Sequence, residues 1–525
     1  FAFRYGVARD LQNGRTEMVK HYQFESGLSI TGSKADERYP IKPSEEPGVI
    51  LQLYNEIAKL AGQTTVTSGI KHPAIEKIAA TLWSLRGKSI VVSGSNDPDV
   101  QMVINAINAL LDNYGNTLDL NRLLLTNQAI DSDMNLLVEE MKNGTVGGLI
   151  MWNCNPAFDY HQPEDFIEGL KNMKVTVSMN GTVNETNEHF RYVLPAHHYL
   201  ESWDDAEPKT GVYSLAQPVI RNIFNTRQPQ DSLLKWMGST TDYYQYIKTN
   251  WLYRSVIIPE SEWNATLQKG VYEIETPVRN YSFNGTLLND SLAAIAAKVK
   301  QPANNIEVQA YTGIALGNGI HANNPWLLEL PDPITKVSWD NIASISAATA
   351  QKLNLITGSL ILINGLKFPV YIQPGQADDT ISVALGYGHI KYGKVATGIG
   401  SNAYKLVTYD NNSRCRNKIT GFSGFSERIK NPCLIPPISV KLFSESDPAI
   451  SFPSISFNGS SLPGLFNAKA SKPVNNTPVI DNNMIVSVLN TFLIYLCYKV
   501  YILVWRGLRY KFINNFSNYT GLLNF

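Results

Sequence analysis

The chain has 525 residues, and its 45 Lys plus Arg balance its 45 Asp plus Glu, so it carries no net charge at pH 7. This balance, without a basic stripe interleaved with aromatics, argues against nucleic acid as a partner. The four cysteines, Cys154, Cys415, Cys433 and Cys497, form no C-x-x-C pair, so neither a zinc motif nor a cubane iron–sulfur motif is present.

The first part of the chain alternates helical and extended patterns. It begins at Phe1 without Met or a recognisable leader, and we expect a fragment. Apolar residues at helical spacing predict helices over residues 47–62, 74–85, 99–113, 132–142 and 163–173. Short apolar runs predict strands at 89–92, 149–152 and 175–179. The alternation predicts an α/β body with a doubly wound, Rossmann-like parallel sheet over about 40–235.

Polar turn residues follow two of these predicted strands. The run at 149–152 is apolar throughout, which is typical of a strand buried on both faces, and it stops at an Asn-Cys-Asn-Pro turn. The strand at 89–92 is closed in a similar way by Gly-Ser-Asn-Asp. Loops at the carboxyl ends of parallel strands usually carry the ligand site. The candidate binding residues are therefore Gly94, Ser95, Asn96, Asp97, Asn153 and Asn155.

The periodicity changes twice in the second half. Residues 236–305 are aromatic and irregular with weak helical pieces, and we interpret them as an insertion. Residues 306–408 then carry short strand-like runs punctuated by Gly and Pro, which predict a compact β-barrel. Gly317 and Gly319 within this region would let a backbone approach a nucleotide, although a lone Gly-x-Gly is a weak signal.

The composition changes abruptly near residue 410. Residues 409–525 form an atypical tail that contains three of the four cysteines, and we expect it to pack poorly against the rest. Residues 484–505 approach the roughly 20 apolar residues that span a bilayer, and basic residues follow them. The alternative is an out-of-frame or miscalled terminus in an AT-rich gene. Both interpretations stay open.

Several stretches carry a family resemblance. They are GLIMWNCNPAFDY with FRYVLPAHHYLESWDD, then LPDPITKVSWDNIASISAATAQKLNLITGSLILI, and finally ALGYGHIKYGKVATGIGSNAYKL. In order and spacing they resemble the molybdopterin oxidoreductases of the dimethyl-sulfoxide-reductase type. SKADERYPIKPSEEPGVILQLYNEIAKLAG and HANNPWLLELPDP are most similar to one branch, the large iron–sulfur subunit of alternative complex III. The resemblance covers residues 1 to about 408.

The resemblance implies an organisation and a cofactor. Residues 1–235 would be an N-terminally truncated α/β core, and residues 306–408 a dinucleotide-binding-like barrel of the double-psi type. Backbone amides and polar side chains at the candidate loops, including Gly317 and Gly319, would cradle a molybdopterin. The alternative is that these loops are ordinary turns of an α/β sheet. In this family, iron–sulfur clusters are expected in a further C-terminal region that the tail does not match.

Other chemistry-bearing residues give weaker patterns. His197 and Glu201 stand at i, i+4, but His198 points elsewhere and no third ligand has zinc-like spacing, so we predict no metal site. Cys154 is expected to be a small buried residue rather than a molybdenum ligand. No nucleophilic triad is recognisable, since GFSGF at 421–425 lacks a strand–elbow–helix context. We therefore assign no catalytic residue.

Two functional hypotheses follow from the resemblance. The first is a scaffold that positions iron–sulfur domains and contacts the other subunits of a membrane-bound, quinol-oxidising respiratory complex at the periplasmic face of the bacterial inner membrane. In this hypothesis the fragment itself holds no metal and does not catalyse. The second is an active molybdenum bis-pterin oxidoreductase that acts on a small oxyanion or sulfur compound. Metal and pterin content distinguish the two.

Overall fold

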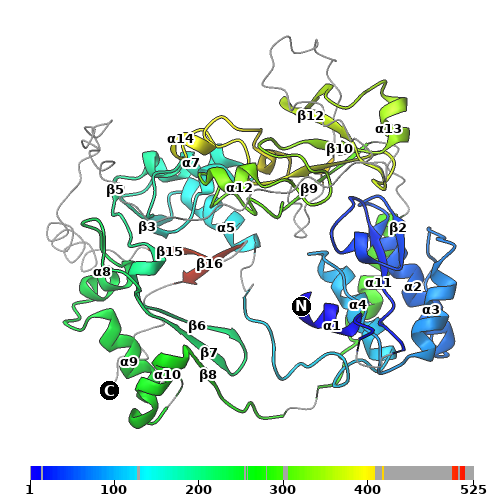
Figure 1. Cartoon of the computed structure of the whole chain (residues 1–525), viewed down its shortest axis with the longest axis horizontal. Coiled ribbons are helices and arrows are strands. Elements are labelled where there is room, and N and C mark those ends of the chain that lie inside the picture. Colours follow the sequence, from blue (N-terminus) through cyan, green and yellow to red (C-terminus); the bar gives the residue numbers. More distant parts are fainter. Residues whose placement is uncertain are drawn as a thin grey trace, which may run out of the picture.

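A computed structural model describes residues 2–12, 16–126, 131–253, 256, 258–278, 281–299 and 306–407, with short strands at 417–418, 499–506 and 509–514. Its strands form sheets of two, three, five and six strands, and helices pack beside them, so the described chain is a mixed α/β structure (Figure 1). After α1 (Ala2–Ala8), strands β1 (Tyr22–Glu25) and β2 (Glu37–Pro40) pair in parallel.

Four helices share one hydrophobic core, which we call the helical unit. They are α2 (Glu46–Leu60), α3 (Ile75–Ser84), α4 (Pro98–Leu110) and α11 (Leu288–Val299). The apolar faces meet at buried residues such as Leu51, Ile107 and Ile295. The helices predicted at 47–62, 74–85 and 99–113 are confirmed, because the 3.6-residue period identified the faces that the core covers.

The strand predicted at 89–92 is wrong. The segment joins no sheet, and its backbone is held by a side chain instead. The carboxamide of Asn108, which is buried on α4, accepts a hydrogen bond from Val91 N at 3.0 Å and donates one to Val91 O at 2.8 Å. β-branched residues favour extended backbone, but a strand also needs a neighbour, and none of the described strands lies beside this segment.

A mainly parallel sheet holds the strand that ends in Asn-Cys-Asn-Pro. Its strand order is β16-β15-β3-β4-β5. Alternate residues of β3 face opposite layers: Leu149 and Met151 pack with α5 and α7, while Ile150 packs with Trp236 of α8. The predicted burial on both faces is confirmed. The elements are α5 (Asp131–Lys142), β3 (Val146–Trp152), α6 (Pro156–Asp159), α7 (Pro163–Lys171), β4 (Val175–Met179), β5 (Tyr192–Val193) and α8 (Pro229–Trp236).

The sheet that contains β3 is smaller than the predicted one, and its doubly wound topology stays a prediction. Between residues 41 and 145 no described residue belongs to a strand of this sheet, so the predicted extent of 40–235 is wrong. Two strands from the tail extend the sheet: β15 (Lys499–Arg506) pairs in parallel with β3, and β16 (Arg509–Asn514) pairs antiparallel with β15. The last residues of the apolar segment 484–505 therefore lie in β15, and 484–498 lie outside the described residues. Among the described helices, none combines the length and apolar character needed to cross a bilayer.

An antiparallel sheet and short helices occupy the middle of the chain. Trp251, Trp263 and Leu215 bring the helices and the sheet into one buried cluster. Segment 236–305 is thus more regular than its sequence indicates, because large aromatic side chains at irregular spacing still find a common core. The elements are β6 (Asp204–Lys209), β7 (Val212–Ala216), α9 (Tyr243–Tyr253), α10 (Trp263–Lys269) and β8 (Val271–Glu273).

Short, closely spaced strands form the last unit, as predicted. They are β9 (Glu307–Tyr311), β10 (Ala343–Ile345), β11 (Leu360–Ile363), β12 (Leu366–Ile372) and β13 (Thr380–Ala384). With β14 (Asn417–Lys418) their order is β11-β12-β10-β13-β9-β14, mixing parallel and antiparallel pairs. Helices α12 (Pro325–Glu329), α13 (Ala347–Lys352) and α14 (Gly393–Ala396) lie between strands. Closure into a double-psi barrel stays a prediction.

Replacing Asn108 by Ala should lower the free energy of unfolding by about 2 to 3 kcal/mol, because Val91 N–H and C=O would lose their partner beside a buried helix face. The control is Asn105→Ala on the exposed side of α4, which should change stability by about 0.5 kcal/mol or less. Urea unfolding of both variants checks this. Equal effects would show that the Asn108 bonds do not hold the segment.

Candidate functional site

The carboxyl ends of β3 and β4 meet at one edge of the parallel sheet. The loop after β3 contains Asn153, Cys154 and Asn155, and the loop after β4 begins at Asn180. The Asn180 side chain accepts a hydrogen bond from Cys154 N at 3.2 Å and donates one to Cys154 O at 3.0 Å. Parallel strands place their ends together, and here an asparagine carboxamide joins the two loops directly.

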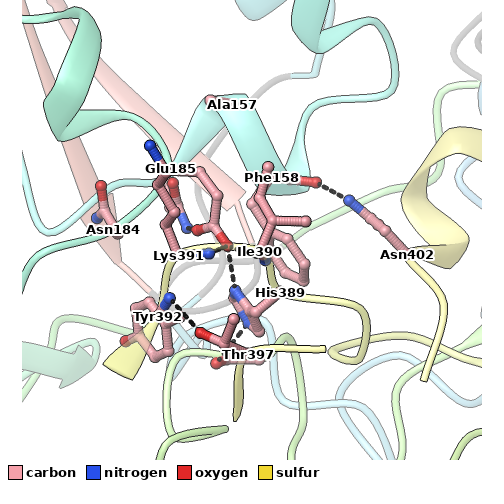
Figure 2. A network of polar contacts seen from close by, with 12 residues as sticks. Ala157, Phe158, Asn184, Glu185, His389, Ile390, Lys391, Tyr392, Thr397 and Asn402 are labelled. Atoms are coloured by element: carbon pink, nitrogen blue, oxygen red, sulfur yellow. Dashed lines mark hydrogen bonds and ion pairs between the residues drawn. The ribbon is translucent and has the colours of Figure 1, made fainter. Parts of the chain in front are cut away.

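Segments from the last unit close over these loops. The turn around Gly319 and the stretch 386–392 approach the strand ends, and Asn402 donates to Phe158 O at 2.8 Å (Figure 2). They border a partly open cavity of about 50 Å³. It is lined by Asn153, Cys154, Asn155, Phe158, Asn180, Asn184, Gly319, His389 and Tyr392, among others.

Glu185 is the buried acceptor at the centre of the site, and 5% of the residue is exposed. One oxygen, Oε1, accepts hydrogen bonds from the backbone N–H groups of Ile390 at 2.9 Å and Lys391 at 3.1 Å (Figure 2). The other, Oε2, accepts from Asn155 Nδ2 at 2.7 Å. Burial alone would raise the pKa of Glu185, but hydrogen bonds from His389 and Asn155 outweigh it and lower that pKa to about 2.

His389 is the side-chain partner of Glu185 from the last unit. Its Nδ1 lies 3.0 Å from Glu185 Oε1, and its Nε2 lies 3.2 Å from the carbonyl oxygen of Gly319. Both neighbours are acceptors, and each ring nitrogen satisfies its neighbour when it carries hydrogen. The ring stacks between Phe158 at 3.6 Å and Tyr392 at 4.5 Å, measured between centroids. Glu185 and His389 thus form a buried, hydrogen-bonded pair.

The structure brings together part of the predicted binding set. Asn153, Asn155 and Gly319 line the cavity, and Gly317 lies two residues before Gly319. The close backbone approach predicted at the glycines is made inside the protein: a Cβ on Gly319 would lie 2.9 Å from His389 Nε2 and 3.0 Å from Gly386 Cα.

Gly94, Ser95, Asn96 and Asp97 lie in the helical unit and do not line this cavity. Their hydrogen bonds organise the start of α4. Asp97 is its N-cap and accepts from Asp99 N at 3.0 Å, and Lys298 of α11 lies 3.4 Å from Asp97 and 3.0 Å from Asp99. Capping and ion pairing occupy the carboxylate. Their part in holding a cofactor stays a prediction.

The weaker candidates have local roles. His198 caps the short turn Tyr199–Glu201, and Glu201 accepts hydrogen bonds from Ile223 N and His198 N, which lower the pKa of Glu201. Cys154 is buried, as predicted, and its Sγ lies 3.1 Å from Trp152 O. Across the part of the chain that the structure describes, no three His, Cys, Asp or Glu residues are grouped to hold a metal ion.

Sequence reasoning missed Glu185, His389 and Phe158. Glu185 and His389 are 204 residues apart, and neither belongs to a motif with a recognisable spacing. The one available signal was that a single histidine stands within GYGHIKYG, a stretch that resembles the family. Glu185 and His389 come together only because the last unit packs against the sheet around β3.

The site as built does not fit a pterin dinucleotide. Pockets for small molecules usually measure roughly 300–1,000 Å³, whereas this cavity measures about 50 Å³. The side chains that would have to donate or accept toward a ligand, Asn155 and Asn180, already bond to Glu185 and Cys154. A cofactor at this position would need more room than the cavity provides.

Comparisons with known proteins agree on the fold. No family model matches the sequence. The menaquinone reductase, molybdopterin-binding-like subunit of Nitratidesulfovibrio vulgaris is 21% identical over 428 residues, covering 72% of this chain and 61% of that protein. The solved structure of acetylene hydratase from Pelobacter acetylenicus aligns with a TM-score of 0.53 at 14% identity, covering 76% of this chain and 72% of the other. The chain thus spans less than two thirds of its curated relative. Together the two support a fold of the molybdopterin oxidoreductase superfamily.

Glu185 should make stability depend on pH. Its folded pKa of about 2 lies below the ordinary value of 4.5, so its contribution is present above about pH 4.5 and is lost as the pH falls toward 2. In Glu185→Gln we expect a loss on the order of 2 to 3 kcal/mol at pH 7, shrinking between pH 4.5 and 2. Urea unfolding of both proteins at several pH values tests this. A difference independent of pH would contradict the assigned charge.

Gly319→Ala should destabilise the protein by about 2 to 3 kcal/mol, because its Cβ would meet His389 and Gly386. The control is Gly358→Ala: Gly358 has a similar positive φ, +90° against +99° at Gly319, but open space around its Cβ position. Gly358→Ala should cost about 1 kcal/mol, from backbone strain alone. Chemical denaturation measures both, and equal losses would mean that the close approach is not limiting.

Proposed function

We propose that this chain is a scaffold subunit of a respiratory, quinone-linked electron-transfer complex, and that the complex is of the quinol-oxidising alternative complex III type. Its relative is named as a subunit of a menaquinone reductase, which supports the quinone-linked, multi-subunit setting. The finer assignment rests on the sequence resemblance over residues 1 to about 408. The periplasmic face of the inner membrane is part of the same proposal.

One observation carries the scaffold role: a buried pair of the protein's own side chains joins the loops at the strand ends to the last unit. Glu185 and His389 tie the loop after β4 to the last unit, and Asn155 joins them from the loop after β3. A ligand-binding site keeps such polar groups available for the ligand. Here they hold the sheet around β3 and the last unit together. A scaffold needs such a fixed arrangement of its units.

Exposed apolar side chains support contact with partner subunits. The loop 217–227, which follows β7, exposes Val219, Ile223 and Phe224. Its backbone is nonetheless ordered by protein contacts, since Val219 N donates to Leu200 O at 2.7 Å and Ile223 N to Glu201 at 2.9 Å. An ordered loop that presents large apolar groups to solvent is typical of a protein-binding surface.

Electron transfer would then belong to domains or subunits that this chain positions. Cysteine thiolates are the usual ligands of iron–sulfur clusters, and Cys154 is buried against Trp152. Cys415, Cys433 and Cys497 lie outside the described residues. The proposal therefore assigns clusters to the region with which the family continues.

Metal and pterin analysis of the purified full chain tests the proposal. We expect neither molybdenum, tungsten nor iron at stoichiometric level by mass spectrometry, and no fluorescent pterin after oxidative extraction. A bound pterin without metal would contradict the interpretation that the Glu185–His389 pair leaves no room for a ligand, and would remove the observation on which the scaffold role rests. Stoichiometric molybdenum with pterin would overturn the scaffold role in favour of a molybdenum oxidoreductase that acts on a small oxyanion or sulfur compound.

A further inference from the structure

Residues 90–92 precede the Gly-Ser-Asn-Asp loop. Their backbone forms hydrogen bonds along one edge and leaves the other edge without protein partners among the described residues. On one side Val91 directs its N–H and C=O to Asn108. In extended backbone, neighbouring residues direct these groups to opposite sides, so those of Ile90 and Val92 point away from Asn108. Among the described residues, none bonds to the backbone of Ile90 or Val92. The two side chains are also exposed, at 50% and 73%.

A cavity of about 490 Å³ runs alongside this segment. Val92 lines one side, Ile104 of α4 lies in the lining, and Leu118, Leu120 and Phe283 contribute further apolar surface. The remaining lining residues are Ser, Asn, Gln, Met, Tyr and Val, and none of the lining side chains carries a charge. The lining therefore favours an uncharged occupant.

We propose that Ile90–Val92 is a docking edge for a β-strand of a partner polypeptide, whose apolar side chains enter the adjoining cavity. Two residues with free N–H and C=O groups, separated by one residue bonded on the other side, repeat the hydrogen-bonding pattern of a sheet edge. Strand addition satisfies such groups, and pockets beside the edge accept alternate side chains. A small apolar molecule would fill the cavity but leave the backbone groups unpaired.

The probe is the uncharged peptide acetyl-Thr-Val-Thr-Val-Thr-Val-Thr-amide, added at about 1 mM to the full chain. We expect amide hydrogen exchange at Ile90 and Val92 to slow at least tenfold, because both N–H groups gain acceptors. The matched control peptide is N-methylated at two adjacent central residues, which removes a donor from each of its edges, and it should give no protection. Unchanged exchange with the first peptide, or equal protection by both, overturns the proposal.

Variants of the chain supply a second test. Val92→Asp places a charge on the edge, and strand edges use charges to prevent pairing, so binding of the fluorescently labelled peptide should weaken at least tenfold. Ile356→Asp is the control, since Ile356 is also exposed, at 65%, and does not line the cavity. Equal effects would overturn the proposal. So would protection at Ile90 and Val92 that rises with protein concentration without peptide, because it would assign the edge to a second copy of the chain.

Discussion

The buried pair of Glu185 and His389 is the interaction on which the arrangement of the strand ends depends. A carboxylate removed from water costs several kcal/mol unless it is paired and hydrogen-bonded, and Glu185 meets that requirement only when three separate segments are in place. The loop after β3 supplies Asn155, the loop after β4 carries Glu185 itself, and residues 389–391 supply the imidazole and two backbone N–H groups. Displacing any one of these segments would leave charge unpaired.

The Glu185–His389 pair also affects whether the strand ends can bind a ligand. Superfamily folds carry many functions, and function follows from the site rather than from the fold. In this chain the loops at the strand ends satisfy one another, through Asn180 with Cys154 and Asn155 with Glu185. The imidazole of His389, stacked on Phe158, completes the packing. The polar groups that could have contacted a ligand hold the interior together instead.

Patterns with a local cause were predictable from the sequence. The helices around Leu51 and Ile107 and the two-sided burial of β3 follow from residue spacing. The positions of the apolar residues within an element determine which of its faces is buried. The strand expected at 89–92 failed because pairing depends on a neighbour that the local sequence does not specify. The antiparallel sheet near Trp251 was missed for the same reason, since its core is assembled from irregularly spaced aromatics.

The candidate site was predictable only in part. Strand-end turns located Asn153 and Asn155, and glycine spacing located Gly319, because turn chemistry is local. Long-range packing determines which of these residues lie close together and which other side chains separate them. Glu185 and His389 show no spacing signal, and a buried charge is recognised only once its partner is known. Asp97 shows the converse, since a loop that resembles a binding turn is held by the capping of its own helix.

The position of α11 makes the helical unit discontinuous along the chain. Leu292 and Ile295 are buried against helices that end by Leu110, so the polypeptide leaves this core and returns to it at residue 288. Most of the described residues between them belong to other units, namely the sheet around β3 and the antiparallel sheet. During synthesis, α2, α3 and α4 therefore leave the ribosome before α11, and the apolar surface that α11 covers is exposed until then. A truncation placed anywhere before residue 288 would remove the last wall of a core that begins more than a hundred residues upstream.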